Sequence, residues 1–186
     1  MNHTPIIMDI IKELMMTLTA ISPNATDDLI HCHLSHKNVF VAGAGRSGYV
    51  ARGFAMRLMH LGYRSYFVGD STTTSIQKED LLIICSGSGE TKSLLAMVEK
   101  AKRIQSHVAL ITINPNSTIG KLADTCVCIP APSPKVAIET SYQSVQPMGS
   151  LFEQSLMIYL DMIVMVLMNE LQISSDQMFK NHANLE

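Results

Sequence analysis

The residues best suited to chemistry are the glycines and hydroxyl residues of the stretch Ser86-Gly87-Ser88-Gly89-Glu90-Thr91. This stretch follows an apolar run at residues 81–85 and precedes a helical pattern that begins near Lys92. Glycines let backbone N–H groups converge on a ligand, hydroxyls add donors, and a helix start supplies unpaired N–H groups and a positive dipole end. The stretch therefore predicts a phosphate site. The ligands expected from it are Ser86, Gly87, Ser88 and Thr91.

A second stretch of the same kind, Gly43-Ala44-Gly45-Arg46-Ser47-Gly48, follows the apolar run at residues 39–42. For one hydroxyl-rich turn, the simpler alternative is a helix cap that binds nothing. Two such turns favour a site, because the carboxyl ends of parallel strands meet at one edge of a sheet and can share a pocket. Gly45, Arg46 and Ser47 therefore join the candidate site.

A dinucleotide site is a weaker alternative. Gly43, Gly45 and Gly48 fit the pattern GxGxxG, and Asp70 follows the next predicted strand, as a ribose-binding acid would. However, Asp70 lies further downstream than usual, and the second loop would have no role. A P-loop is excluded, because Thr91 precedes Lys92-Ser93 where that motif has glycine. No cofactor is predicted.

The apolar patterns indicate which elements carry these loops. Strands are predicted at residues 38–42, 65–68, 81–85, 108–113 and 125–129, with helices at 49–61, 92–104 and 119–123 between them. An amphipathic helix at residues 7–21 and a short helix from Thr26 precede this core. Such alternation is typical of an α/β fold with a parallel sheet covered on both faces.

The carboxyl-terminal part holds a long loop and a long helix. Residues 130–148 contain four prolines and no periodicity, and loops of that length are usually functional or mobile. Residues 150–171 form a helix that is apolar nearly all round. Glu153, Gln154 and Asp161 interrupt it, so its apolar run is too short to cross a bilayer. We expect a helix buried on several sides, partly against another subunit.

Composition limits the classes of function. The chain has 186 residues and a net charge of −2, which gives no electrostatic footprint for nucleic acid. No signal peptide is recognisable at residues 1–5, so we expect a cytoplasmic protein whose four cysteines are free thiols. A small-molecule substrate is expected, with no nucleic acid and no membrane as partners.

Two further groups of residues, a histidine cluster and a threonine run, could belong to a site. His31, Cys32, His33 and His36 lack the spacing of a known zinc site, so they are expected to be ordinary, partly exposed residues and no metal is predicted. The run Thr72-Thr73-Thr74 is expected near the mouth of the pocket, with a solvated loop as the alternative.

Five segments together resemble a known family. These are the two glycine stretches, Phe54-Ala55-Met56-Arg57-Leu58-Met59-His60, Pro147-Met148-Gly149-Ser150-Leu151-Phe152-Glu153-Gln154 and the terminal His182-Ala183-Asn184-Leu185-Glu186. The set is similar to the 6-phospho-3-hexuloisomerases, a family of sugar isomerase (SIS) domains, over essentially the whole chain. Asp70, where glutamate is expected, and the absence of proline at residues 72–75 depart from the pattern.

The resemblance implies a single SIS domain over residues 1–186, a three-layer α/β/α sandwich with a five-stranded parallel sheet of flavodoxin-like or Rossmann-like topology. Its expected parts are amino-terminal helices (1–36), a parallel βα core (37–130), an active-site loop (131–149), and the long helix with a tail (150–186). The resemblance also implies a homotetramer with active sites at subunit interfaces.

The activity implied is metal-free interconversion of D-arabino-hex-3-ulose 6-phosphate and D-fructose 6-phosphate, in the ribulose monophosphate route of formaldehyde assimilation or detoxification. Moving a carbonyl from C3 to C2 needs a base and a cis-enediol. Glu153, near the start of the long helix, is the candidate base, although a first-turn glutamate also stabilises a helix dipole. His182 is the second candidate catalytic residue, acting in a neighbouring subunit's pocket; a frayed tail histidine is the alternative.

Two other functions remain open at this stage. One is an isomerase of another phosphosugar, such as arabinose 5-phosphate. The other is a SIS module that senses a sugar phosphate without converting it, as in transcriptional regulators that join this domain to a helix-turn-helix. The absence of a basic surface disfavours the regulator.

Overall fold

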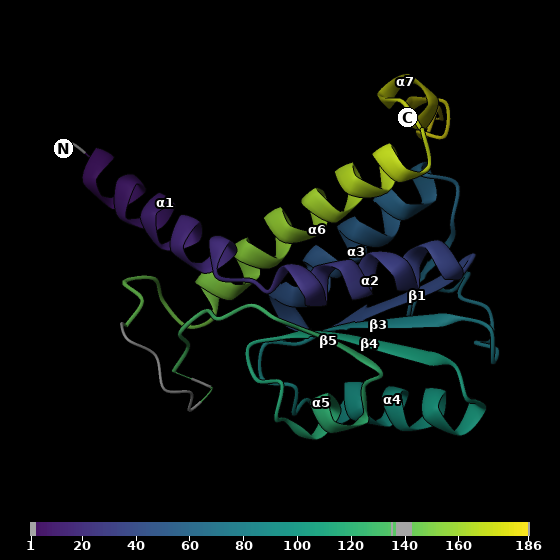
Figure 1. The fold of residues 1–186 in the computed structure, drawn as a ribbon, viewed down its shortest axis with the longest axis horizontal. Helices are drawn as coiled ribbons and strands as arrows, with labels where there is room; N and C mark the ends of the chain where they lie inside the picture. Colours follow the sequence, from purple (N-terminus) through teal and green to yellow (C-terminus); the bar gives the residue numbers. More distant parts are fainter. Residues whose placement is uncertain (1–2, 135, 137–142, 186) are drawn as a thin grey trace.

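The computed structural model describes residues 3–134, 136 and 143–185, and its centre is a parallel sheet with the strand order β2-β1-β3-β4-β5 (Figure 1). The strands are β1 (Asn38–Gly43), β2 (Arg64–Phe67), β3 (Leu81–Cys85), β4 (His107–Thr112) and β5 (Thr125–Cys128). The helices are α1 (Thr4–Thr19), α2 (Pro23–Ser35), α3 (Gly45–His60), α4 (Lys92–Ile104), α5 (Thr118–Leu122), α6 (Ser150–Glu170) and α7 (Ser175–Phe179).

The sheet separates two apolar cores. Successive strand side chains point to opposite faces, so Val39 and Val41 enter one core while Phe40 and Ala42 enter the other. Helices α2, α3 and α6 cover the first face, and α4 and α5 cover the second (Figure 1). The predicted α/β/α sandwich with a five-stranded parallel sheet is confirmed.

The main difference from the predicted elements is the start of α3. This helix begins at Gly45 and not near residue 49, so most of the predicted loop forms its first turn. Gly45 has a φ of 57°, a left-handed conformation that favours glycine. Gly48 then packs directly on β1, because a Cβ there would lie 2.7 Å from the carbonyl oxygen of Gly43. Two glycines thus bring the helix start close to the strand end.

Helix α6 is the one segment, among the described residues, with the length and apolar composition of a membrane span. Half of its most apolar window is buried inside the molecule, where Leu156, Tyr159 and Ile163 join the first core. These contacts make it a core helix. Met157, Ile158 and Met165 lie on its exposed side.

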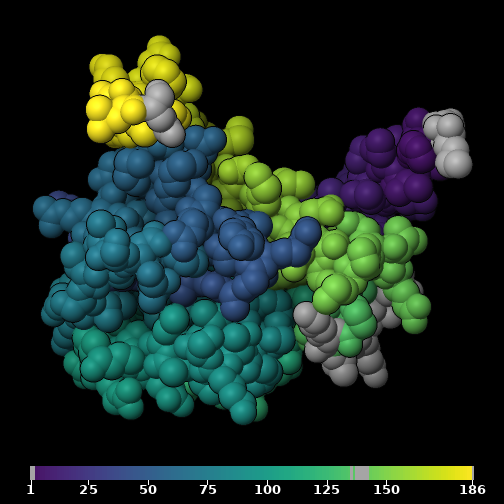
Figure 2. All heavy atoms as spheres, turned by 180° about the vertical axis from the view of Figure 1, so that it is seen from behind, coloured from purple at the N-terminus to yellow at the C-terminus, as the bar shows by residue number. Residues whose placement is uncertain are grey.

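Helix α1 has an unusual distribution of side chains. It projects from the body of the molecule (Figure 2), and its exposed residues include Ile7, Ile11 and Met15. Its two buried residues are polar, Glu13 and Thr17. Leu14 and Leu18 are partly buried against the first core, so α1 has apolar residues on its inner side as well as on its exposed side.

The expectation of partly exposed residues on α2 is wrong for His33. This side chain is fully buried and packs edge-on against Phe54 and Tyr63, and neither ring nitrogen has a hydrogen-bond partner among the described residues. Burial lowers the pKa of His33 from 6.5 to about 3, so the ring is neutral in the folded chain. Within the part of the chain that is described, no group of three or more His, Cys, Asp or Glu side chains suits a metal ion.

This buried ring predicts a loss of stability in mild acid. The unfolded chain binds a proton at His33 below pH 6.5, whereas the folded chain does so only near pH 3. The stabilisation is therefore complete above pH 6.5 and falls as the pH approaches 3. Between pH 7 and pH 4.5 the contribution of His33 to the free energy of unfolding should decrease by about 2–3 kcal/mol. Urea unfolding of the wild type and His33→Leu at both pH values measures this difference.

The matched control is His31→Leu, which removes an exposed histidine from the same helix. It should leave the pH dependence of unfolding close to that of the wild type. An identical pH dependence in His33→Leu and the wild type would show that His33 does not carry the effect.

Candidate active site

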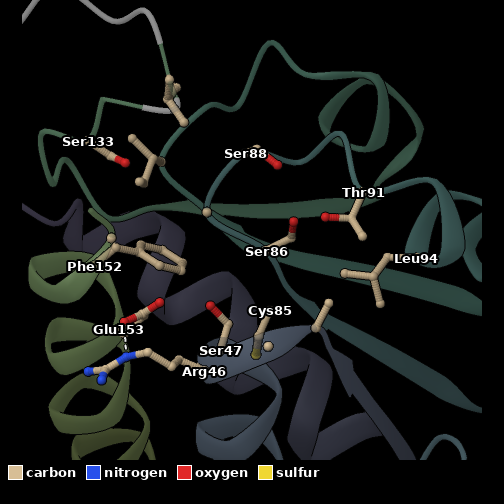
Figure 3. A pocket seen from close by; sticks show the side chains of 16 residues that line it. Arg46, Ser47, Cys85, Ser86, Ser88, Thr91, Leu94, Ser133, Phe152 and Glu153 are labelled. Carbon is tan, nitrogen blue, oxygen red and sulfur yellow. Dashed lines mark hydrogen bonds and ion pairs between the residues drawn. The ribbon is translucent and has the colours of Figure 1, made fainter. Parts of the chain in front are cut away.

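The candidate site is a pocket of about 180 Å³ at the carboxyl ends of β1 and β3 (Figure 3). Its walls come from the starts of α3, α4 and α6 and from the segment before α6. The lining residues are Ala44, Gly45, Arg46, Ser47, Cys85, Ser86, Gly87, Ser88, Thr91, Leu94, Ile113, Ser133, Val136, Gly149, Phe152 and Glu153. Both glycine stretches thus open into one pocket, as the sequence predicts.

The loop between β3 and α4 holds its hydroxyl groups in fixed orientations. Ser86 Oγ accepts a hydrogen bond from the backbone N–H of Gly89 at 3.2 Å, and Ser88 Oγ accepts one from Glu90 at 3.2 Å. A hydroxyl that accepts such a bond still has its own hydrogen to donate. Both serines therefore remain donors for an anion in the pocket.

The start of α4 favours a binding site over a simple helix cap. Thr91 occupies the N-cap position, but its side chain makes no capping hydrogen bond and lies beside the pocket. The first N–H groups of a helix have no intrahelical acceptor. In α4 these N–H groups and the Thr91 hydroxyl are available to bind an anion. The dipole of α4 adds a favourable potential for a negative charge.

Close contacts favour glycine at two positions of this loop. Gly89 has a φ of 65°, and a Cβ there would lie 2.0 Å from Ser117 Oγ. At Gly87 a Cβ would lie 3.2 Å from Cδ1 of Phe152, which packs over the loop from α6. Glu90 points away, because its Oε1 accepts the N–H of Thr118 at 2.7 Å, and hydrogen bonding by the side chain and then the backbone of Thr118 lowers the pKa of Glu90. Glu90 therefore supports the loop by capping α5.

The charged pair of the pocket joins α3 to α6. Arg46 Nε donates a hydrogen bond to Glu153 Oε2, and the two side chains are 65% and 18% exposed. Glu153 lies in the first turn of α6, where its N–H donates to the carbonyl of Gly149 at 3.0 Å. Figure 3 shows the carboxylate below Phe152 and facing the side of the pocket that carries Ser47. Within the described ranges, no hydrogen bond engages Oε1 of Glu153, so this oxygen could accept one from a ligand.

Eight of the nine residues predicted for the site therefore surround one pocket. His182 does not: it follows α7, where its ring stacks on His60 and Phe179 at centroid distances of 5.5 and 5.6 Å. It lines a separate hollow with Arg57 and Asp161 beside the carboxyl-terminal half of α6, whereas Glu153 lies in the first turn of that helix. Within one chain these two candidate catalytic residues cannot meet.

Local contacts argue against the weaker dinucleotide alternative and against one further prediction. Asp70 pairs with Arg52, whose guanidinium stacks on Phe67 at 4.1 Å, so Asp70 is not poised to bind a ribose. Thr73 donates a hydrogen bond to the carbonyl of Phe67 at 2.8 Å and lines a different, apolar hollow with Thr74. The prediction that this threonine run lies at the pocket mouth is wrong.

Of the sixteen lining residues, eight were not among the predicted site residues, including Ser133 and Phe152. Ser133 comes from the aperiodic stretch before α6, where no spacing identifies it. Phe152 is predicted only as part of the segment at residues 147–154 that carries the family resemblance, with no role in the site. Phe152 directly precedes Glu153 in the first turn of a helix that faces the pocket. This position in the sequence is what could have identified it.

Comparison with known proteins is consistent with this geometry. The family model of the SIS domain matches residues 34–158, which include both glycine loops and Glu153. The chain belongs to the SIS domain family. The match places the whole parallel sheet and the first half of α6 inside the SIS domain, with α1 and α7 outside the matched residues.

Several relatives have a more specific name. The "3-hexulose-6-phosphate isomerase" of Bacillus subtilis is 46% identical over 186 residues, which is 100% of both chains. The protein of the same name from Methanocaldococcus jannaschii is 41% identical over 87% of this chain and 84% of its own. A crystal structure of the Methanococcus jannaschii protein MJ1247, described as inferring that same function, has a TM-score of 0.84 and 36% identity and covers 96% of this chain and 98% of its own.

The loop geometry of this SIS domain predicts the effect of Gly89→Ala. The new Cβ would overlap Ser117 Oγ, and the left-handed backbone would cost about 1–2 kcal/mol. The loop must therefore move, and the affinity for inorganic phosphate should fall about tenfold or more. Titration calorimetry with phosphate measures the affinity, and a thermal melt measures the accompanying loss of stability.

Gly53→Ala is the control, because Gly53 lies in the interior of α3 and, among the described residues, no side chain or other element comes within 4 Å of the added Cβ apart from its immediate chain neighbours. It should leave phosphate binding unchanged and raise the stability by up to about 1 kcal/mol. Unchanged phosphate affinity in Gly89→Ala would exclude this loop as the phosphate site.

Proposed function

We propose that this protein is a 3-hexulose-6-phosphate isomerase, which interconverts D-arabino-hex-3-ulose 6-phosphate and D-fructose 6-phosphate. The observation that carries the proposal is the pairing, in one pocket, of a hydroxyl and helix-start anion site with the carboxylate of Glu153. The named relatives, which match nearly the full chain, support this substrate over other phosphosugars. The corresponding pathway is the ribulose monophosphate route, and the cytoplasm is the corresponding location.

The substrate's chemistry simplifies the task of the enzyme. With O6 phosphorylated, a ketone at C3 can close only onto O1 or O5, and each closure gives a strained four-membered ring. The 3-ketose therefore enters as an open chain, and no acid is needed to open a ring in this direction. The catalytic step then moves one proton from C2 to C3 and a second proton from the O2 hydroxyl to O3.

Glu153 is the proposed base for that transfer. Arg46 holds Oε2 and leaves Oε1 to take the proton from C2, which gives a cis-enediolate; protonation of O3 then completes the cis-enediol. The same carboxyl group then returns a proton to C3. The guanidinium of Arg46 lies beside the carboxylate and can balance the charge of an enediolate oxygen.

The phosphate would be bound by the two glycine loops. Ser86, Ser88 and Thr91 supply hydroxyl donors from one side, and Ser47 supplies another from the start of α3. Gly45 and Gly87 allow the backbone to approach the ligand closely. Residues 131–149 act as the active-site loop, and Ser133 and Gly149 are their contributions to the wall.

A homotetramer completes the proposed site. The exposed apolar residues of α1 and α6, such as Ile7, Ile11, Met15 and Met165, are candidates for burial between subunits. Since His182 lies far from Glu153 in its own chain, it would reach the pocket of a neighbouring subunit. There it would donate a proton to, or polarise, the substrate oxygens.

The first experiment is a coupled assay of the isomerase with Glu153→Gln. A separate synthase makes the 3-hexulose phosphate from formaldehyde and ribulose 5-phosphate, and fructose 6-phosphate formation is followed with a chelator present. The wild type should be active, because the proposed mechanism uses no metal. Glu153→Gln keeps the shape and the contact with Arg46 but not the base, so kcat should fall by about 10²–10⁴-fold.

Glu170→Gln, at the other end of α6, is the matched control and should retain full activity. An inactive wild type would argue against this substrate and favour another phosphosugar or a sensor. Full activity in Glu153→Gln would keep the isomerase but exclude Glu153 as its base.

The assembly can be tested with Met15→Lys. Met15 is 61% exposed on the outer side of α1, and a charge there should oppose burial against another copy. Light scattering at micromolar concentration should give four times the chain mass for the wild type and a smaller species for the variant. Asn116→Lys, which adds the same charge in the exposed loop before α5, should leave the assembly intact. A monomeric wild type would contradict both the tetramer and the role of His182.

A further inference from the structure

The buried carboxylate of Glu13 on α1 lies outside the pocket, but it contacts the segment that leads to the pocket. Its side chain accepts hydrogen bonds from the Val145 N–H at 2.7 Å, the Ser144 hydroxyl at 2.8 Å and the Gln146 side-chain amide at 3.0 Å. Glu13 is only 7% exposed. In the described part of the chain, no lysine, arginine or histidine forms an ion pair with it.

Burying this carboxylate needs a compensating interaction. An ionised carboxylate loses a large hydration energy on burial unless hydrogen bonds replace it, and bonds to a charged acceptor are about twice as strong as neutral ones. All three donors come from residues 144–146. The energy of the interaction therefore goes into fixing that short segment against α1.

The chain that follows transmits this position to α6. Pro147 has a restricted φ, and Met148 has a φ of 55°, which is costly for a residue with a side chain. The Ser150 N–H donates to the Pro147 carbonyl at 3.1 Å, which closes the turn at the helix start. Strained conformations of this kind persist only where their surroundings fix them. Because Glu13 holds Gln146 and the residues after Gln146 are restricted, the first turn of α6 can adopt few positions.

We propose that Glu13 is a positioning residue for the isomerase reaction: it holds residues 144–146, and thereby places Gly149 and Glu153 at the pocket. The inference rests on the proposed function of Glu153. Glu13 does not line the pocket and acts only through the segment it binds. Glu13 lies on the buried side of α1, whereas the exposed side of this helix carries apolar residues. Helix α1 therefore supports the active site through its buried side.

The test compares Glu13→Ala with Asp9→Asn, which removes a carboxylate from an exposed position of the same helix. Losing charge-assisted hydrogen bonds should speed amide hydrogen exchange at residues 144–149 by about tenfold or more in Glu13→Ala. The kcat for isomerisation should fall about tenfold, because Glu153 is no longer held in place. The KM for fructose 6-phosphate should change less, since the phosphate loop belongs to β3 and α4. Asp9→Asn should match the wild type in all three measurements.

Two further variants make the result specific. Glu13→Gln keeps the size of the side chain and removes one acceptor, so it should be intermediate in exchange and in kcat even if Glu13→Ala folds poorly. In a Glu153→Gln background, Glu13→Ala should cause little additional loss, because the group it positions is already absent.

Several outcomes would overturn the inference. These are unchanged exchange at residues 144–149 in Glu13→Ala, an equal loss of kcat in Asp9→Asn, and a fully additive loss in the Glu153→Gln background. A wild type without isomerase activity would overturn the proposed function instead, and the hydrogen exchange would still report whether Glu13 fixes the segment.

Discussion

The ion pair between Arg46 and Glu153 is the interaction on which the site depends, because it joins the starts of two helices separated by 107 positions in the sequence. Neither residue could reach the other unless α3 began directly at the end of β1. That start needs the left-handed Gly45 and the close approach of Gly48 to Gly43. The packing of α6 on α3 in the first core then brings Glu153 to the same point. The packing of the fold and the chemistry of the site therefore both depend on where α3 and α6 begin.

Most of the fold and the phosphate side of the pocket could be predicted from the sequence. The apolar runs of β1, β3 and β4 are continuous and short, and helices with clear periodicity separate them, so only a parallel sheet fits the pattern. Strands of such a sheet end at one edge, which was enough to bring the two glycine stretches together. These predictions need local pattern and topology, and nothing about individual side chains.

The remaining features depend on contacts that no spacing reveals. The burial of His33 follows from its packing against Phe54 and Tyr63, residues that are far from it in the sequence. Thr73 lies in the loop between β2 and β3, and its hydrogen bond to the carbonyl of Phe67 sets its position. Glu13 was not singled out, because an acidic residue on an amphipathic helix usually faces solvent. The burial of Glu13 is explained only by the position of residues 144–146 against α1.

The anion site described above contains no lysine and, apart from Arg46 beside Glu153, no arginine among its described lining residues. A phosphate would be held by neutral donors whose strength changes little with salt. Such a site recognises the phosphate group and little of the molecule attached to it. Discrimination between sugars must then come from the opposite wall, which the segment before α6 and the first turn of α6 provide. In a domain divided in this way, evolution can change the sugar by altering one short region while the phosphate loops stay the same.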